Sequence, residues 1–172
     1  MEKKKDNKKI YMISGIIILI IVLIIGIIIM NLNNNEKYVE VSKRILPQMK
    51  DFLVETVEYS VDLKKEALSI LQNNKYYSDE EAINIVKQDN SYKYYEMKID
   101  EKMSEMYNDL EYLKKHNYSK NRELSNQIKD VVEQFETSIQ EHKELKVDTS
   151  YSNESRNLYE EIQELQNKIN RE

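Results

Sequence analysis

Two histidines and no cysteine leave imidazole and carboxylate groups as the side chains that could hold a transition metal. Di-iron helical bundles place a glutamate three residues before each histidine on an inward helix face. Here Leu113 and Ile139 stand three residues before His116 and His142. On antiparallel helices joined near His116, the two imidazoles would lie about 35 Å apart at 1.5 Å per residue. We therefore expect no metal site, with His116 as a charge partner at a helix C-terminus and His142 as a half-buried residue of a helix seam.

Two acidic clusters could supply a carboxylate pair for hydrolysis: Asp79, Glu80 and Glu81, and Glu160, Glu161 and Glu164. Catalysis of that kind needs two acids across a cleft, one of them in an apolar pocket. We expect both clusters in the first turns of helices, where solvated acids face the positive end of the helix dipole. The clusters are thus interpreted as helix caps, and an unrecognised carboxylate enzyme stays open as a third possibility.

Glycine is missing from residues 31–172, because the only two glycines are Gly15 and Gly26. Phosphate-cradling loops, dinucleotide-binding turns and nucleophile elbows need residues without a Cβ where the backbone turns sharply or approaches a ligand. No Ser/His/Asp arrangement with a supporting glycine loop can be assembled. The sequence therefore predicts no catalytic residue, no cofactor and no enzymatic activity.

Tyrosine is the enriched side chain with binding potential, with thirteen copies. Successive helical residues point in different directions, so Tyr94 and Tyr95 cannot both be core. An exposed ring offers a large contact area with a polar tip. One hypothesis is a contact with a protein partner or a glycan, and the alternative is packing at the ends of a bundle. The candidate contact residues are Tyr76, Tyr77, Tyr92, Tyr94 and Tyr95.

The segment Ile10–Met30 contains 21 residues and is interrupted only by Ser14, Gly15 and Gly26. A helix of that length spans about 30 Å, the thickness of the bilayer hydrocarbon core. A cleaved signal peptide fits poorly, because no small-residue cleavage site follows the segment. We therefore predict a transmembrane signal anchor in contact with the lipid bilayer. Ser14, Gly15 and Gly26 are candidates for contact with another membrane helix, or they face lipid.

Basic residues set the expected orientation. Five lysines precede the apolar segment, and three basic residues follow it within about 15 positions. This places a short basic tail, residues 1–9, in the cytoplasm, and residues 31–172 outside the cell membrane. A tail of nine residues cannot form a signalling domain, so any message would pass through a partner.

The part beyond the anchor is acidic. Residues 31–172 contain 21 basic and 29 acidic side chains, a net charge of −8. That charge argues against binding to nucleic acid or to anionic lipid head groups. We expect no nucleic-acid partner.

Apolar residues beyond a polar spacer, residues 31–36, follow helical spacing. Pro47 should kink the first helix or start a new one. Ser78 and Glu81 form a capping box, and Asp89–Ser91 is a candidate break. The last two helices have narrow apolar seams, as in coiled coils. The expected helices cover 38–71, with Tyr59 on the core stripe, then 79–116, a third after Ser119, and the last from about Asn153, with a turn at 148–152.

These elements predict an all-α protein in which a transmembrane helix precedes an up-down antiparallel bundle of three to four long helices over residues 37–172. An extended coiled coil is the alternative. The expected function is a non-enzymatic interaction module that contacts a protein partner, or itself, as a scaffold or accessory subunit of a cell-envelope complex. A ligand-sensing bundle is the alternative function. The abundance of lysine, isoleucine and asparagine with two alanines indicates an AT-rich genome, as in many bacteria.

Overall fold

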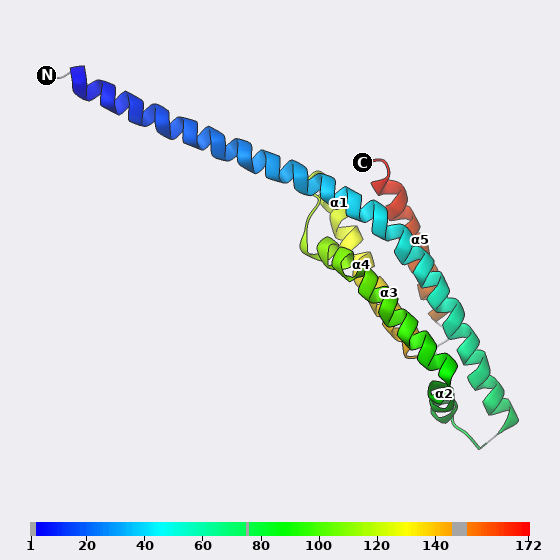
Figure 1. The fold of residues 1–172 in the computed structure, drawn as a ribbon. Coiled ribbons are helices and arrows are strands. Elements are labelled where there is room, and N and C mark those ends of the chain that lie inside the picture. The colour runs from blue at the N-terminus through cyan, green and yellow to red at the C-terminus, as the bar shows by residue number, and fades with distance from the viewer. Residues whose placement is uncertain (1–2, 75, 146–150) are drawn as a thin grey trace. The chain divides into compact units, whose positions relative to one another are not determined.

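The part of the protein that the structure describes is mostly helical and contains no strand (Figure 1). The computed structural model describes the backbone of residues 3–74, 76–145 and 151–172, and the side chains of these ranges except 3–16 and 151–152. The helices are α1 (Lys3–Asn73), α2 (Asp79–Gln88), α3 (Asn90–Lys115), α4 (Arg122–Lys143) and α5 (Tyr151–Ile169).

The chain divides into two compact units, residues 1–37 and 38–172, and α1 contributes to both. In the first unit, α1 is the one described helix long and apolar enough to cross a membrane, and none of its apolar window is buried among the described residues. The side chains from Ile17 to Met30 are about half exposed where they are large and apolar. Residues 31–36, expected as a polar spacer, are helical.

The second unit is an up-down bundle of four long segments with the short α2 added. Arg44 of α1 pairs with Asp109 near the end of α3, whereas Thr56, twelve residues further along α1, bonds Tyr95 near the start of α3. These helices therefore run antiparallel. Lys168 of α5 bonds Gln127 of α4 at 3.1 Å, although Lys168 is near the end of its helix and Gln127 near the start of its own. The helical bundle is confirmed, and Figure 1 shows α3, α4 and α5 alongside the part of α1 after Tyr38.

One apolar core connects the four long helices. Phe52 of α1 meets Phe135 of α4 with ring centroids 6.4 Å apart. Leu113 and Ile162, from α3 and α5, are fully buried in the same cluster. At the end of the bundle that contains Tyr38, that ring stacks on Tyr118 at 6.0 Å, and the Tyr118 hydroxyl donates a 2.6 Å hydrogen bond to Glu172. Contacts between α1, the segment after α3 and the C-terminus therefore close the core at this end of the bundle.

Polar side chains cap the N-termini of α2, α3 and α4 in this glycine-free region. Ser78 and Glu81 form the expected capping box at α2. Asp89 ends α2 and caps α3 by accepting from Ser91 N–H, so the expected break is present. Asn121 caps α4. After α4, Leu145 adopts a left-handed conformation, with φ of 54°, while 1% exposed.

Two local expectations need correction, and one of the two alternatives at Pro47 is excluded. α1 continues through Pro47, so no new helix starts there. The buried neighbours Ile45, Leu46 and Met49 explain this, since their packing offsets the hydrogen bond that proline removes. α5 begins at Tyr151, two residues before the expected start, and residues 148–150 of the expected turn lie outside the described ranges. Glu160, Glu161 and Glu164 lie beyond the first turn of α5, about two turns or more from its start, and Glu154 is the acidic residue of that turn.

Candidate functional site

The five tyrosines singled out from the sequence occupy three different environments. Tyr92 and Tyr95 are buried in the core. Their hydroxyls donate to the backbone carbonyls of Lys143 (2.9 Å) and Thr56 (3.5 Å), and burial raises the pKa of both phenols. Tyr94 is half exposed on α3. The expectation that Tyr94 and Tyr95 differ in burial is confirmed.

Tyr94 and Tyr95 line a groove between α1 and α3 with a volume of about 360 Å³. We call it the tyrosine groove. Its walls and floor are formed by aromatic and apolar side chains and one threonine, and its rim has both signs of charge. The wall and floor residues are Phe52, Thr56, Tyr59, Tyr94, Tyr95 and Ile99, and the rim residues are Glu55, Lys98, Glu101, Lys102 and Glu105.

The exposure of Tyr59, which also lines the tyrosine groove, was not predicted from the sequence. Its ring lies 5.6 Å from that of Tyr95, and it is 46% exposed, whereas the spacing argument placed it on the core stripe of its helix. Tyr59 lies at the edge of the buried face of α1, between buried Thr56 and Leu63. Helical spacing assigns an edge residue to the core as readily as to a groove wall, so only the position of α3 separates the two.

Charged pairs order the rim of the tyrosine groove. Lys98 and Glu101 pair at 2.8 Å, as do Lys102 and Glu105. The hydrogen bond from Lys98 lowers the pKa of the Glu101 carboxyl. The Lys98 ammonium also lies 5.8 Å from the centre of the Tyr94 ring. Two half-exposed tyrosine faces beside fixed donors and acceptors can contact both the apolar and the polar parts of a bound group.

The Thr56 hydroxyl is a buried polar atom within this groove. Thr56 is 1% exposed, and its Oγ1 has no hydrogen-bond partner in the described part of the chain. Leaving a buried hydroxyl unpaired costs about 1–3 kcal/mol. This hydroxyl lies beneath the surface of the tyrosine groove, where it is covered by its neighbours.

Tyr76 and Tyr77 do not line the tyrosine groove. They follow the end of α1 and precede the Ser78 cap of α2. Tyr76 is 96% exposed and Tyr77 is 41% exposed. The structure thus separates the predicted contact region into the groove and an exposed turn.

His142 is buried rather than half buried, which corrects the expectation for this residue. Its Nδ1 lies 2.8 Å from the hydroxyl of Ser60 on α1, and its Nε2 lies 2.8 Å from that of Ser155 on α5. Ser60 donates its own proton to the carbonyl of Val57. This assigns the Nδ1–H tautomer, in which Nδ1 donates to Ser60 and Nε2 accepts from Ser155. Burial lowers the pKa of His142 to about 4.

His116 ends α3 as its C-cap residue, the position expected for it. Its ring stacks on Tyr112 with centroids 4.1 Å apart, and its Nδ1 lies 3.0 Å from the Tyr112 carbonyl oxygen. The imidazole can therefore satisfy a carbonyl group of the last helical turn.

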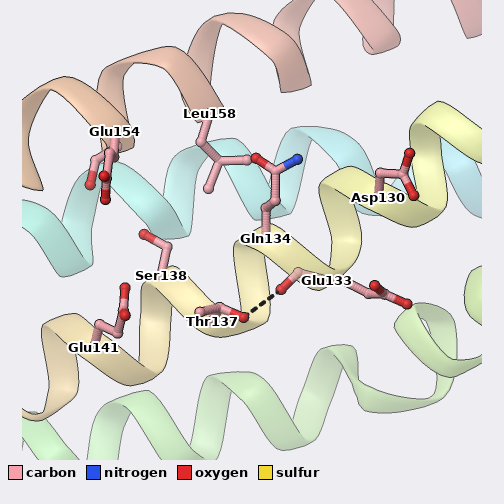
Figure 2. A pocket seen from close by; sticks show the side chains of 9 residues that line it. Asp130, Glu133, Gln134, Thr137, Ser138, Glu141, Glu154 and Leu158 are labelled. Carbon is pink, nitrogen blue, oxygen red and sulfur yellow. Dashed lines mark hydrogen bonds between the residues drawn. The ribbon is translucent and has the colours of Figure 1, made fainter.

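A second groove of about 470 Å³ runs between α4 and α5 and is lined by acids and small polar side chains. Figure 2 shows Glu141 and Glu154 at one end and Asp130 at the other, with the Thr137 hydroxyl bonded to the Glu133 carbonyl. Among the described residues, no three His, Cys, Asp or Glu side chains converge on one metal position. The groove is a solvated acidic surface that includes Ser155.

The candidates for membrane-helix contact lie in the first unit. The backbone of Ser14 and Gly15 is helical, and the Ser14 side chain is outside the described part. A Cβ added at Gly26 would meet nothing within 4 Å. Gly26 therefore has room for a close approach by another helix.

The chain matches no family model, and no curated protein or solved structure matches it either.

Proposed function

We propose that this chain is a single-pass membrane protein that presents its helical bundle outside the membrane as an interaction module, a scaffold or accessory subunit of a cell-envelope complex. The observation that supports a binding role is the tyrosine groove, where half-exposed Tyr59 and Tyr94 present aromatic surface beside the charged pairs of the rim. The uncovered apolar window of α1 and the five lysines before it support the anchor and its orientation.

Photo-crosslinking from the groove rim tests the binding role. A photoreactive amino acid replaces Glu101 at the rim of the tyrosine groove, or Asn126 on the exposed face of α4 as the matched control. In native membranes we expect a discrete adduct from position 101 and none from position 126. Tyr94→Ala in the first variant should reduce the adduct at least tenfold, because aromatic anchors dominate interface energies. Equal adducts at both positions, or an adduct that survives Tyr94→Ala, would contradict the proposal.

Thiol labelling tests the orientation. The chain has no cysteine, so Lys5→Cys and Lys120→Cys each introduce a single thiol. A membrane-impermeant reagent applied to intact cells should label position 120, and should label position 5 only after permeabilisation. The reverse pattern would refute the orientation.

Ligand sensing is the second candidate, favoured because α1 contributes both the apolar window and the groove residues Phe52, Thr56 and Tyr59 without a helix break. A compound in the groove would therefore contact the same helix that forms the anchor. The discriminating measurement is the melting temperature of the full chain in detergent with a panel of small metabolites. A rise that Tyr94→Ala abolishes would favour sensing over a purely structural contact.

A further inference from the structure

Exposed basic side chains gather at the end of the bundle that contains Tyr38. Three segments meet there, because the Tyr38 ring stacks on Tyr118, between α3 and α4, and the Tyr118 hydroxyl donates to Glu172, after α5. The hydrogen bond from Tyr118 lowers the pKa of the Glu172 carboxyl, and Lys120 and Lys43 lower it further, so both lysines face the same acid. We define the basic cluster as the exposed bases of these three segments that form no ion pair within the described part of the chain: Lys43, Lys120, Arg122 and Arg171.

The fold leaves the charge of the basic cluster available. Nearby Arg44 and Lys168 pair with Asp109 and Glu164, whereas the four cluster residues lie beyond ion-pair distance of every described carboxylate. The segments 38–44, 116–124 and 168–172 together contain six bases and three acids. The rest of residues 38–172 contains 14 bases and 25 acids. The bundle unit is therefore polarised, with a basic end at Tyr38 and an acidic remainder.

The chain itself holds this basic end close to the anchor. Tyr38 follows Met30, the last residue of the apolar segment, by eight residues, and α1 is helical across them. Eight helical residues span at most about 12 Å, of which the head-group layer takes about 5–7 Å. The remaining distance is shorter than the Debye length of about 8 Å at physiological salt, so charges around Tyr38 act on the lipid head groups.

The chemistry of the cluster fits phosphate. Lysine and arginine beside a bilayer are attracted to anionic lipids, and the guanidinium groups of Arg122 and Arg171 can each donate two hydrogen bonds to one phosphate. An anionic surface repels the acidic remainder of the unit, including Asp79, Glu80 and Glu81 at the start of α2. Attraction at one end and repulsion elsewhere favour a single orientation of the bundle on the membrane.

We propose that the basic cluster binds the head groups of anionic lipids in the membrane that holds α1, and so docks the bundle on the bilayer by its Tyr38 end. The inference rests on the proposed anchor and is independent of the tyrosine groove. The net charge of −8 for residues 31–172 argues against such binding only as an average. That average combines a basic end with an acidic remainder, and it is the basic end that lies next to the anchor in the chain.

Energy transfer to labelled lipids tests this docking in the full chain. Asn170→Cys provides a single exposed thiol beside the basic cluster for a donor dye, because the chain has no cysteine. The protein is reconstituted in vesicles of phosphatidylcholine and phosphatidylglycerol, in which one lipid or the other has the acceptor dye on its acyl chain. At low salt, transfer to labelled phosphatidylglycerol should be at least twofold greater than to labelled phosphatidylcholine. High salt should remove the difference.

Charge removal assigns the preference to the basic cluster. The triple variant Lys120→Gln, Arg122→Gln and Arg171→Gln should transfer equally to both lipids. A matched triple variant removes the same charge from exposed positions outside the cluster and should keep the preference: Lys65→Gln, Lys93→Gln and Arg156→Gln. Equal melting temperatures of the two triple variants would show that both bundles are intact. A preference that survives in the first triple variant, or that is lost in the second, would overturn the proposal.

Flotation with the vesicles at high salt reports the anchor separately, because an inserted helix stays bound when charges are screened. A chain that does not float would overturn the anchor and this inference together. A chain that floats and transfers equally to both lipids at low salt would overturn this inference alone.

Discussion

At the scale of single residues, His142 is the polar side chain that connects most of the bundle. It bonds Ser60 of α1 and Ser155 of α5 from its own place on α4. A buried polar group is costly unless its partners are in register, so such a group disfavours shifted packings of the same helices. Spacing placed His142 on a seam, but its burial and partners depend on two helices distant in sequence.

The lowered pKa of His142 predicts that stability falls as the pH decreases. The unfolded chain takes up a proton near pH 6.5, while the folded chain resists it until about pH 4. The stabilising contribution of neutral His142 is therefore fully present above pH 6.5 and is lost as the pH falls from 6.5 to 4. Between pH 7 and 5 the loss should be about 2 kcal/mol, measured by urea unfolding.

Comparison with His142→Gln isolates this effect. Carboxyls with lowered pKa values, such as Glu81 and Glu111, stabilise the fold above about pH 4.5 and lose that contribution as the pH falls below this value, so they change stability little between pH 7 and 5. The His142→Gln variant should have a lower free energy of unfolding than the unmodified protein at pH 7, and this free energy should change little from pH 7 to 5. An equal decline in both proteins would assign the pH dependence to other groups.

At the scale of elements, the helix ends were more predictable than the helix interiors. The Ser78 cap and the Asp89 break depend on neighbours within three residues, so the sequence contains their full cause. Pro47 inside α1 and the exposure of Tyr59 depend on packing against other helices, which local spacing does not contain. The groove was therefore half predicted: Tyr94 and Tyr95 were identified, and Tyr59 and Thr56 were not.

At the end of α4 we predict that a glycine substitution is less destabilising than an alanine substitution, the reverse of the usual order in helices. Leu145 adopts φ of 54°, a conformation that costs a residue with a Cβ about 1 kcal/mol or more. Leu145→Ala and Leu145→Gly both lose a buried side chain, at about 2–5 kcal/mol. Glycine alone also relieves the backbone strain, so Leu145→Gly should be the more stable variant by about 1 kcal/mol in urea unfolding. Inside a helix the order is reversed, and that reversed order here would contradict the strain.

At the scale of the whole molecule, the second compact unit should fold without the first. Residues 38–172 contain the entire buried core, including the contact between Tyr118 and Glu172. A fragment of these residues should unfold in one cooperative thermal transition, followed by circular dichroism. A matched fragment ending at Leu145 lacks α5 and should lose cooperativity, because it exposes the core faces that Leu158 and Ile162 cover. A fragment 38–172 that melts without a cooperative transition would refute the independence of this unit.

The fold class could be predicted from the sequence, whereas the pairing of the helices could not. Apolar periodicity and short connections were sufficient for an all-α bundle. The tyrosine groove and the His142 contacts required knowing that α1 meets α3, α4 and α5, and periodicity is the same for any of these pairings.

The place of α1 in the chain has a consequence for biosynthesis. Its partners are far away in sequence: Asp109 is 65 residues beyond Arg44, and Gln163 is 113 residues beyond Lys50. A ribosome therefore completes the bundle half of α1 well before the helices that cover it. At a translation rate of roughly 5–20 residues per second, the apolar face of α1 stays uncovered for several seconds before α5 is made. During that interval the nascent helix is a substrate for chaperones, until α5 is made and covers the apolar face of α1.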